Sequence, residues 1–242
     1  MLSGWKRSLK HMSYGQTELI HVIRRCGLTS GLKLCLDAGD AASYSSGQSW
    51  LDTSGNGYDF FLGATGGAEA SDPTFNGTAG QRASTNYWSF DGGDFFRYDA
   101  ANEAWMNNLH KDNAKFTIFE ALYYAGSGAA PLVGTSNSTI GVEIYVNPKL
   151  NILVLNTAPV LNAIDSTALV ANAWNILAVS LDEAVGAGGG LFFVNGTTTT
   201  FTSTYVSPSA ASASETMDIG SYAGDSFLMV NTARLAMFAV WE

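Results

Sequence analysis

The stretch GLKLCLDAGDAASYSSGQSWLDTSGNGYDFFLG, residues 31–63, carries the pattern that decides the fold. From Leu32 to Leu36, leucine occupies every second position, and this period of two is typical of a half-buried strand. Between Trp50 and Gly57 the chain is rich in Asp, Ser, Asn and Gly, which favour turns. The stretch therefore predicts a strand followed by a polar, turn-rich loop.

The same pattern continues through the rest of the chain. Apolar residues alternate with others in 142–147 and 177–182, whereas 115–124 and 234–241 are apolar at nearly every position, as expected for central strands. Asn195-Gly196 lies between two strand-like runs and supplies the positive φ angles of a tight hairpin turn. Roughly a dozen such runs predict an all-β sandwich. Past residue 30 the one short helix we expect is at 100–108.

These motifs, taken in order, resemble laminin-G-like, concanavalin A-like jelly-roll domains. The matching pieces are the loop Trp50-x-Asp52-x-Ser54-Gly55-Asn56-Gly57, SFDGGDFF (89–96), AWNILAVSLD (173–182), FFVNG (192–196), DIG (218–220) and RLAMFAVW (234–241). The resemblance covers residues 31–242 and implies a concanavalin A-like β-sandwich, or jelly roll. Many relatives with this opening are found in tailed-phage virion proteins and in secreted or surface proteins of bacteria.

The N-terminal segment differs from the body in charge. Residues 1–30 hold five basic residues and one acidic residue, whereas 31–242 hold 7 basic and 20 acidic residues. An apolar stripe and two terminal arginines predict a short helix here. We predict two parts: a basic, helical anchoring arm (1–30) and a lectin-like sandwich domain (31–242). The docking residues of the arm would be Trp5, Lys6, Arg7, Lys10, Leu19, Ile20, Ile23, Arg24 and Arg25. The alternative is that this helix packs on its own acidic body.

Length, composition and charge exclude several classes of protein. The 242 residues carry a net charge of -9, and 46% of them are hydrophobic, which excludes intrinsic disorder. The acidic balance argues against nucleic acid as a partner, since phosphate contacts need clustered Lys and Arg. No apolar run approaches the roughly 18 residues that span a bilayer. The first 26 residues lack the pattern of a signal peptide. We therefore expect a protein made in the host cytoplasm and released in a virion by lysis.

No motif for catalysis or for a cofactor is present. None of the eight glutamates is followed two positions later by Asp, so the Glu-x-Asp-x-Glu pattern of related glycoside hydrolases is missing. Glu120 stands alone in an apolar run, and we interpret it as an outward or hydrogen-bonded core residue rather than a functional acid. The histidines, His11, His21 and His110, form neither a catalytic triad nor a metal site. We predict no catalytic, cofactor-binding or metal-binding residue.

Three features leave alternatives open. Asp52-x-Ser54-x-Asn56-Gly57-x-Asp59 has the spacing of a calcium loop but lacks the distal Glu, so we interpret it as a hydrogen-bonded turn, with calcium as the alternative. We expect Cys26 and Cys35 to be free thiols, although one bridge would be possible. Five aromatic residues either stack on sugar rings or, as we favour, pack into the core: Tyr44, Trp50, Tyr58, Tyr87 and Trp88.

These observations give a ranked set of functional hypotheses. The first is a non-enzymatic component of a bacteriophage virion, a capsid decoration, head-fibre or tail-associated protein, whose arm binds other virion proteins. The alternative is a carbohydrate-binding lectin or adhesion module that recognises host or environmental glycans. A glycan-cleaving enzyme ranks third, because the paired carboxylates are missing. We expect a homo-oligomer, as is common for such proteins.

Overall fold

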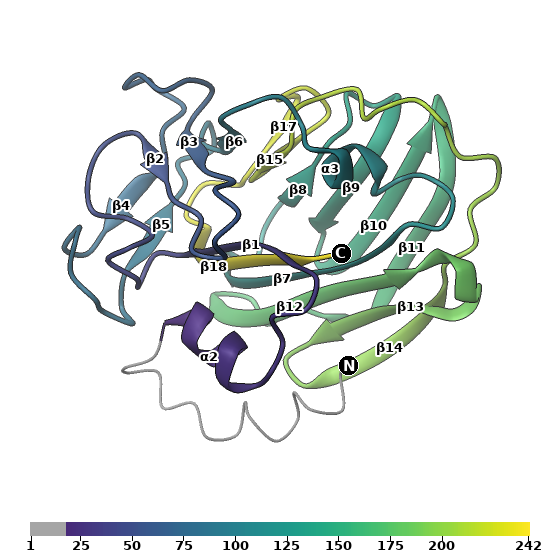
Figure 1. The fold of residues 1–242 in the computed structure, drawn as a ribbon, viewed down its shortest axis with the longest axis horizontal. Coiled ribbons are helices and arrows are strands. Elements are labelled where there is room, and N and C mark those ends of the chain that lie inside the picture. The colour runs from purple at the N-terminus through teal and green to yellow at the C-terminus, as the bar shows by residue number, and fades with distance from the viewer. Residues whose placement is uncertain (1–17) are drawn as a thin grey trace.

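The computed structural model describes residues 18–242, which form two packed β-sheets (Figure 1). Sheet A contains eight strands. Along the sheet the order is β14 (Thr197–Thr202), β13 (Ala187–Val194), β12 (Ala173–Asp182), β7 (Lys115–Tyr124), β18 (Arg234–Trp241), β5 (Tyr87–Ser89) and β4 (Thr74–Asn76). The eighth strand, β1 (Leu32–Asp37), also pairs with β18.

Sheet B also contains eight strands. Their order is β11 (Ala158–Ala168), β10 (Lys149–Asn156), β9 (Ile140–Val146), β8 (Ala130–Gly134), β15 (Asp218–Ile219), β6 (Phe96–Tyr98), β3 (Phe60–Leu62) and β2 (Ser49–Trp50). A separate hairpin joins β16 (Ser221–Tyr222) to β17 (Phe227–Leu228). The helical elements are α2 (Leu19–Arg25), α3 (Ala104–Asn108) and the 3-10 turn Glu183–Val185. No helix in residues 18–242 is long and apolar enough to cross a membrane.

The core lies between the two sheets, and alternation along the strands fills it. In β9, Val142, Ile144 and Val146 are buried in the core, so the period of two predicted from the sequence is confirmed. Trp50 and Trp88 are fully buried there, with ring centroids 5.8 Å apart. The predicted β-sandwich is therefore correct for the described residues, and these two tryptophans serve packing rather than surface recognition.

Strands β7 and β18 are apolar on both faces because the core covers one face and α2 covers part of the other. The inner side of β7 packs into the core, and its outer residue Phe119 lies in a second cluster with Ala239 and Trp241 of β18. Leu19, Ile20 and Ile23 of α2 complete that cluster and are almost fully buried. Burial of this kind contributes about 1.5–3 kcal/mol for each large aliphatic side chain.

Polar contacts fix α2 in this position. The Leu19 backbone N–H donates to Asp37 Oδ2 at 2.8 Å, and an ion pair of 2.7 Å joins Glu18 to Arg82. Just past the helix, Leu28 O accepts from the Trp241 indole N–H at 2.7 Å. The helix ends as the sequence predicts, with Arg24 and Arg25 in its last turn and Gly27 at φ +67°.

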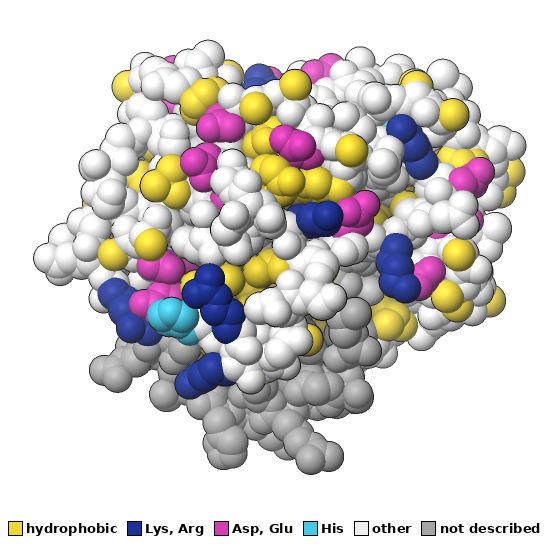
Figure 2. Space-filling model, in the orientation of Figure 1, with side chains coloured by type: hydrophobic (Ala, Val, Ile, Leu, Met, Phe, Trp, Pro, Cys, Tyr) yellow, Lys and Arg dark blue, Asp and Glu magenta, His cyan; other side chains and the backbone are white. Residues whose placement is uncertain are grey.

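The position of α2 bears on the predicted arm. Leu19, Ile20 and Ile23 contact the chain's own sheet, which is the alternative we considered, so these three side chains are not an open docking surface. Arg24 and Arg25 are exposed, and Figure 2 shows basic side chains gathered over α2 beside acidic ones. The remaining docking residues, Trp5, Lys6, Arg7 and Lys10, lie outside the described residues. Docking through the basic residues stays a prediction.

The loop after β2 is tied into the fold by its own carboxylates. Asp52 Oδ1 accepts from the backbone N–H groups of Cys35 and Ser54, and its Oδ2 accepts from those of Gly57 and Tyr58. Asp59 Oδ1 accepts from the Asp52 N–H at 2.8 Å. These bonds make the loop a hydrogen-bonded turn. Among residues 18–242 no three His, Cys, Asp or Glu side chains cluster as metal ligands would.

Smaller sequence predictions can also be compared with the structure. Asn195 and Gly196 both have positive φ and connect β13 to β14, as predicted. The short helix predicted at 100–108 is present as Ala104–Asn108. No disulfide joins Cys26 to Cys35, as we expected, and Cys35 is buried, which raises the pKa of its thiol to about 12.

The interpretation of Glu120 was wrong in its details. This side chain points into the core from the middle of β7, where its Cα partners are Leu177 and Phe238. It is neither outward nor hydrogen-bonded, because neither carboxyl oxygen has a partner. Burial raises its pKa well above the ordinary value, because the charged form would lose its hydration there.

Candidate functional site

A row of charged residues crosses the outer face of sheet B, the face turned away from the core. Arg97 of β6 is the Cα partner of Asp218 in β15, Asp218 is that of Gly134 in β8, and Gly134 is that of Glu143 in β9. Residues directly opposite each other in a sheet point to the same face. The long strands β8 to β11 that carry one end of this row stand side by side in Figure 1.

Gly134 is the point where another segment crosses the sheet. A Cβ atom at this position would lie 2.4 Å from Tyr222 Cβ and 2.9 Å from Ser221 O. Only glycine therefore allows the backbone of β16 to approach β8 so closely. The hairpin β16–β17 consequently packs on the outer face of sheet B, between Asp218 and Glu143.

The hairpin builds a strip of aromatic rings beside Glu143. Tyr145, on the same face of β9, has its ring centroid 5.5 Å from that of Tyr222. Tyr222 in turn stacks on Phe227 with centroids 5.0 Å apart and an interplanar angle of 21°. Along the strip Tyr145 is half-buried, Tyr222 is buried and Phe227 is 50% exposed. We call Glu143, Tyr145, Tyr222 and Phe227 the tyrosine face.

Arg97 holds the hairpin in place through two carboxylates. Its Nε and one terminal nitrogen donate to Asp218 at 2.9 and 2.7 Å, a bidentate arrangement. The same terminal nitrogen contacts Asp225, in the turn of the hairpin, at 2.8 Å. Ala223 and Asp225 both have positive φ in this turn, a conformation that the ion pair helps to maintain.

Two carboxyl groups in this region titrate near neutrality. Burial raises the pKa of Glu143 to about 7, although the Ser136 hydroxyl, which hydrogen-bonds to it, acts in the opposite direction. Burial likewise raises the pKa of Asp218 to about 7, and Arg97 opposes the shift. Glu143 also raises the pKa of Tyr145, after the effect of burial. The face therefore offers both hydrogen-bond donors and acceptors at neutral pH.

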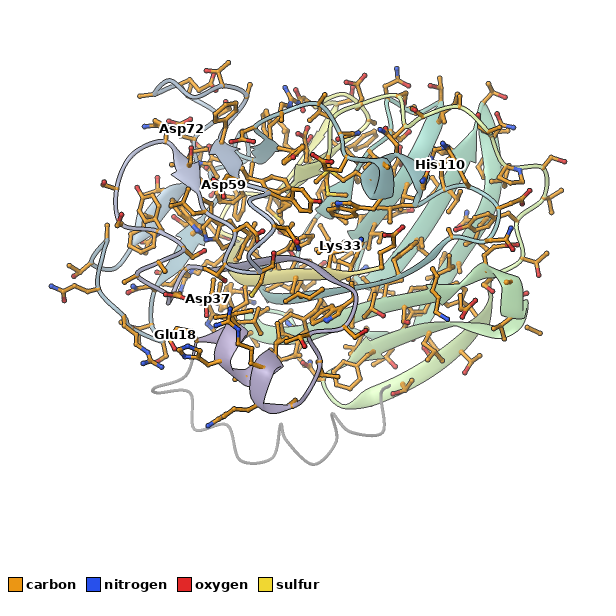
Figure 3. The ribbon with its side chains drawn as sticks, viewed as in Figure 1. Glu18, Lys33, Asp37, Asp59, Asp72 and His110 are labelled. Carbon is orange, nitrogen blue, oxygen red and sulfur yellow. The ribbon has the colours of Figure 1, made fainter. Side chains whose placement is uncertain are left out.

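The residues singled out from the sequence do not converge on this face. Trp50 and Trp88 are buried, and Tyr44 and Tyr58 pack against the core, as we favoured; Tyr87 is half-buried on the other sheet. Figure 3 shows His110 beside α3, away from Asp59 and Asp72. Its Nε2 lies 3.1 Å from Ala211 O, and burial lowers its pKa. This environment is that of a packed histidine, not of a catalytic base.

Sequence reasoning placed part of the tyrosine face but missed the rest. The alternation in 142–147 already put Glu143 and Tyr145 on the outward side of a strand. Tyr222 and Phe227 belong to strands of only two residues each, which carry no periodic signal. The run SYAGDSF (221–227), with Gly and Asp between aromatic residues, was the one available hint of a hairpin.

A hollow of about 450 Å³ lies elsewhere, beside α3 and the C-terminal residue. Its lining includes Trp105, Lys111, Lys115 and Glu242. Lys115 is already paired with Asp182 at 2.6 Å, and polar loop residues form much of the wall. This hollow lacks the aromatic surface of the tyrosine face.

With the two sheets and this face described, the solved structures that share the fold can be named. Domain 4 of AbnA, an extracellular GH43 arabinanase from Geobacillus stearothermophilus solved with arabinotriose, matches 88% of this chain and 94% of its own length, with a TM-score of 0.57 and 13% identity. The botulinum neurotoxin type G receptor binding domain matches 88% of this chain with a TM-score of 0.54 and 12% identity. Trypanosoma rangeli sialidase matches 99%, with a TM-score of 0.54 and 14% identity.

These likenesses establish the β-sandwich fold. This chain spans 48% of the length of the neurotoxin domain and 35% of the sialidase. No protein-family model and no curated protein sequence matches the chain.

Proposed function

We propose that this chain is a carbohydrate-binding, lectin-like module that holds glycans on the tyrosine face. The observation that carries the proposal is the strip of Tyr145, Tyr222 and Phe227 next to Glu143, in which Tyr145 is half-buried and Phe227 is 50% exposed. Flat aromatic surface with a few well-placed polar groups is the usual composition of small-molecule sites, and ring faces stack on the C–H faces of sugars. The arabinanase domain solved with arabinotriose, which matches nearly end to end, supports this choice.

We propose binding without catalysis at this face. A glycosidase needs two carboxyl groups, and Glu143 and Asp218 are the pair that this region offers. Both have raised pKa values. The backbone of Ser221–Tyr222, however, fills the space over Gly134 between them, and Arg97 engages Asp218. A scissile bond placed between two carboxyl groups needs that space to be open. Release of reducing ends from a polysaccharide panel would contradict this proposal.

The binding proposal is tested by a glycan-array screen of the intact chain, followed by titration of the best hit. Phe227→Ala is the main variant, because half of this side chain is exposed and its loss leaves the core intact. We expect affinity to fall about tenfold, as for the loss of one stacked ring. Val185→Ala is the matched control, because this apolar side chain is 59% exposed and belongs to the 3-10 turn before β13, in the other sheet. Equal affinity of both variants for every hit would contradict the assignment.

A virion role is a second candidate, and the two are compatible. It rests on the resemblance of residues 31–242 to jelly-roll domains of the concanavalin A-like type and on the charge contrast between 1–30 and the body. In this candidate the protein, made in a host cytoplasm, attaches to other virion proteins through its basic residues and displays the sandwich outward, as a homo-oligomer.

The test of this candidate must leave α2 in place, because deleting it would uncover Phe119 and Trp241. Reversing the exposed charges, Arg24→Glu with Arg25→Glu, should lower occupancy on purified particles, whereas Lys111→Glu should not. Full occupancy of the double variant would argue against docking through these arginines.

A further inference from the structure

A second aromatic group lies on the outer face of sheet A, on the opposite side of the sandwich from the tyrosine face. Tyr123 of β7 is the Cα partner of both Trp174 in β12 and Arg234 in β18. Tyr87 of β5 completes the group, with its ring centroid 6.0 Å from that of Trp174. We call these four residues the arginine cluster.

Arg234 lies over two aromatic rings. Its guanidinium carbon is 4.6 Å from the centroid of Tyr123 and 5.0 Å from that of Tyr87. Such cation–π contacts fix the plane of the guanidinium and leave its N–H edge free for another group. Trp174 stands edge-on to both tyrosines and is 39% exposed, so part of its indole faces solvent.

Among the described residues, the charge of Arg234 has no counterpart. Within residues 18–242 its guanidinium has neither a hydrogen-bonded acceptor nor an ion-pair partner, and residues 1–17 contain no Asp or Glu. Lys33, Arg82, Arg97 and Lys115 each pair with a carboxylate. Arg234 differs from the other described cations without an ion pair, Arg24, Arg25, Lys111 and Lys149, in lying over aromatic rings. An arginine left unpaired in a chain of net charge -9 is a ready site for an external anion.

We propose that the arginine cluster binds acidic sugars, with Arg234 holding the carboxylate of the ligand and Trp174 stacking on its ring. The guanidinium fork matches a carboxylate through two parallel hydrogen bonds. Ser89, the Cα partner of Arg234, and Asn76, which donates to Ser89 Oγ at 2.8 Å, provide polar groups for sugar hydroxyls at the same edge. The ligand class is a pyranose that carries a carboxylate, either a uronate or a sialate. This inference extends the proposed function to a second face.

The test is calorimetric titration of the intact chain with two acidic probes and their neutral counterparts. Trigalacturonic acid is compared with galactotriose, and sialyllactose with lactose, so that the two sources of carboxylate are distinguished. We expect at least one acidic probe to bind about tenfold or more tightly than its neutral counterpart, the gain of a charge-assisted bidentate pair. Arg234→Gln should abolish that preference, and Arg234→Lys should restore it only in part, because lysine lacks the planar fork.

Controls separate this inference from the proposed function and from a general anion effect. Phe227→Ala, on the other face, should leave the acidic preference intact, whereas Trp174→Ala should weaken binding of the acidic probe. If glutamate tetrapeptide competes as well as the acidic sugar, the cluster is a peptide-binding site and the inference is wrong. It is also overturned if Arg234→Gln retains the preference while its melting temperature matches that of the wild type. Neither of these two results would affect the proposed function, which is tested separately by neutral-sugar binding that depends on Phe227.

Discussion

The outer faces of the two sheets use the same kinds of residue in opposite ways. On sheet B, Arg97 is neutralised by Asp218 and Asp225, and the aromatic strip is assembled by a hairpin that crosses the sheet. On sheet A, Arg234 rests on two tyrosine rings of the sheet itself and has no carboxylate partner among the described residues. An arginine paired with buried acids stabilises the fold, whereas one placed on aromatic rings remains available to a ligand.

Replacing each arginine by methionine should give the largest difference between the faces. Arg97→Met leaves Asp218 buried without its counter-ion, so we expect a loss of about 3 kcal/mol in the free energy of unfolding. Arg234→Met keeps the packing on the tyrosines and removes no ion pair, so its cost should stay below about 1 kcal/mol. Urea unfolding of both variants measures this. Equal losses of unfolding free energy in the two variants would show that the two arginines do not differ in their role.

The raised pKa values of buried carboxyl groups also predict how stability depends on pH. Burial raises the pKa of Glu143 to about 7 and that of Asp37 to about 6, so the folded chain binds more protons than the unfolded chain between about pH 4 and 7. The stabilisation that these extra bound protons give is complete below the pKa values of the unfolded chain. It is lost as the pH rises through the folded-state pKa values of about 6 and 7. We expect the free energy of unfolding to fall by on the order of 3 kcal/mol from pH 5 to pH 8.

Glu143→Gln sharpens that prediction. The amide does not titrate, so the dependence on pH should flatten in this variant, and the flattening should be largest between pH 5 and 8. Chemical unfolding at several pH values gives the slope. A wild-type chain more stable at pH 8 than at pH 5 would show that these carboxyl groups are ionised in the folded state.

Gly134 tests whether the hairpin really builds the tyrosine face. Gly134→Ala forces a methyl group against Tyr222, and we expect a cost of about 2 kcal/mol together with weaker glycan binding. Gly67→Ala is the control, because the nearest atom to its Cβ, Thr65 Oγ1, is 3.7 Å away. Thermal unfolding and titration of both variants suffice. A neutral Gly134→Ala would mean that the hairpin does not lie on β8.

Glu120 lies in the core between the two outer faces. Its replacement should give the smallest change in the free energy of unfolding, and the change should be a gain. Neither of its carboxyl oxygens has a partner, and Leu177 and Phe238 flank it in the core. Glu120→Leu should raise the free energy of unfolding at pH 8 by about 1–2 kcal/mol, because it removes an unsatisfied buried polar group. The gain should shrink at pH 5. A destabilised Leu variant at both pH values would point to a binding partner for this carboxyl group.

The fold could be predicted from the sequence because its evidence is local. Alternation in β9 and β12, the apolar runs of β7 and β18, and the Asn195-Gly196 turn each specify an element within a few residues. Six motifs in order then indicated a sandwich. The helix α2 was predicted too. Its apolar stripe indicates only that these side chains are buried against some surface, and the structure shows that this surface is the chain's own sheet.

Neither candidate site could be predicted in full, because both are assembled by contacts between distant residues; the alternation in 142–147 gave only Glu143 and Tyr145. Arg97 meets Asp218 and Asp225 across 121 and 128 positions of sequence. Tyr87, Trp174 and Arg234 come from three strands that are neighbours only in the folded sheet. The sequence shows such residues as scattered surface positions, and the pairing of the strands alone brings them together.

The most direct test of the account is to titrate the wild type, Phe227→Ala and Arg234→Gln with the best neutral and the best acidic glycan from one array. The account predicts a separation: Phe227→Ala loses affinity for the neutral glycan and Arg234→Gln for the acidic one, each by about tenfold. If the intact, folded chain binds no glycan at all, it is not a carbohydrate-binding module, and the account is contradicted.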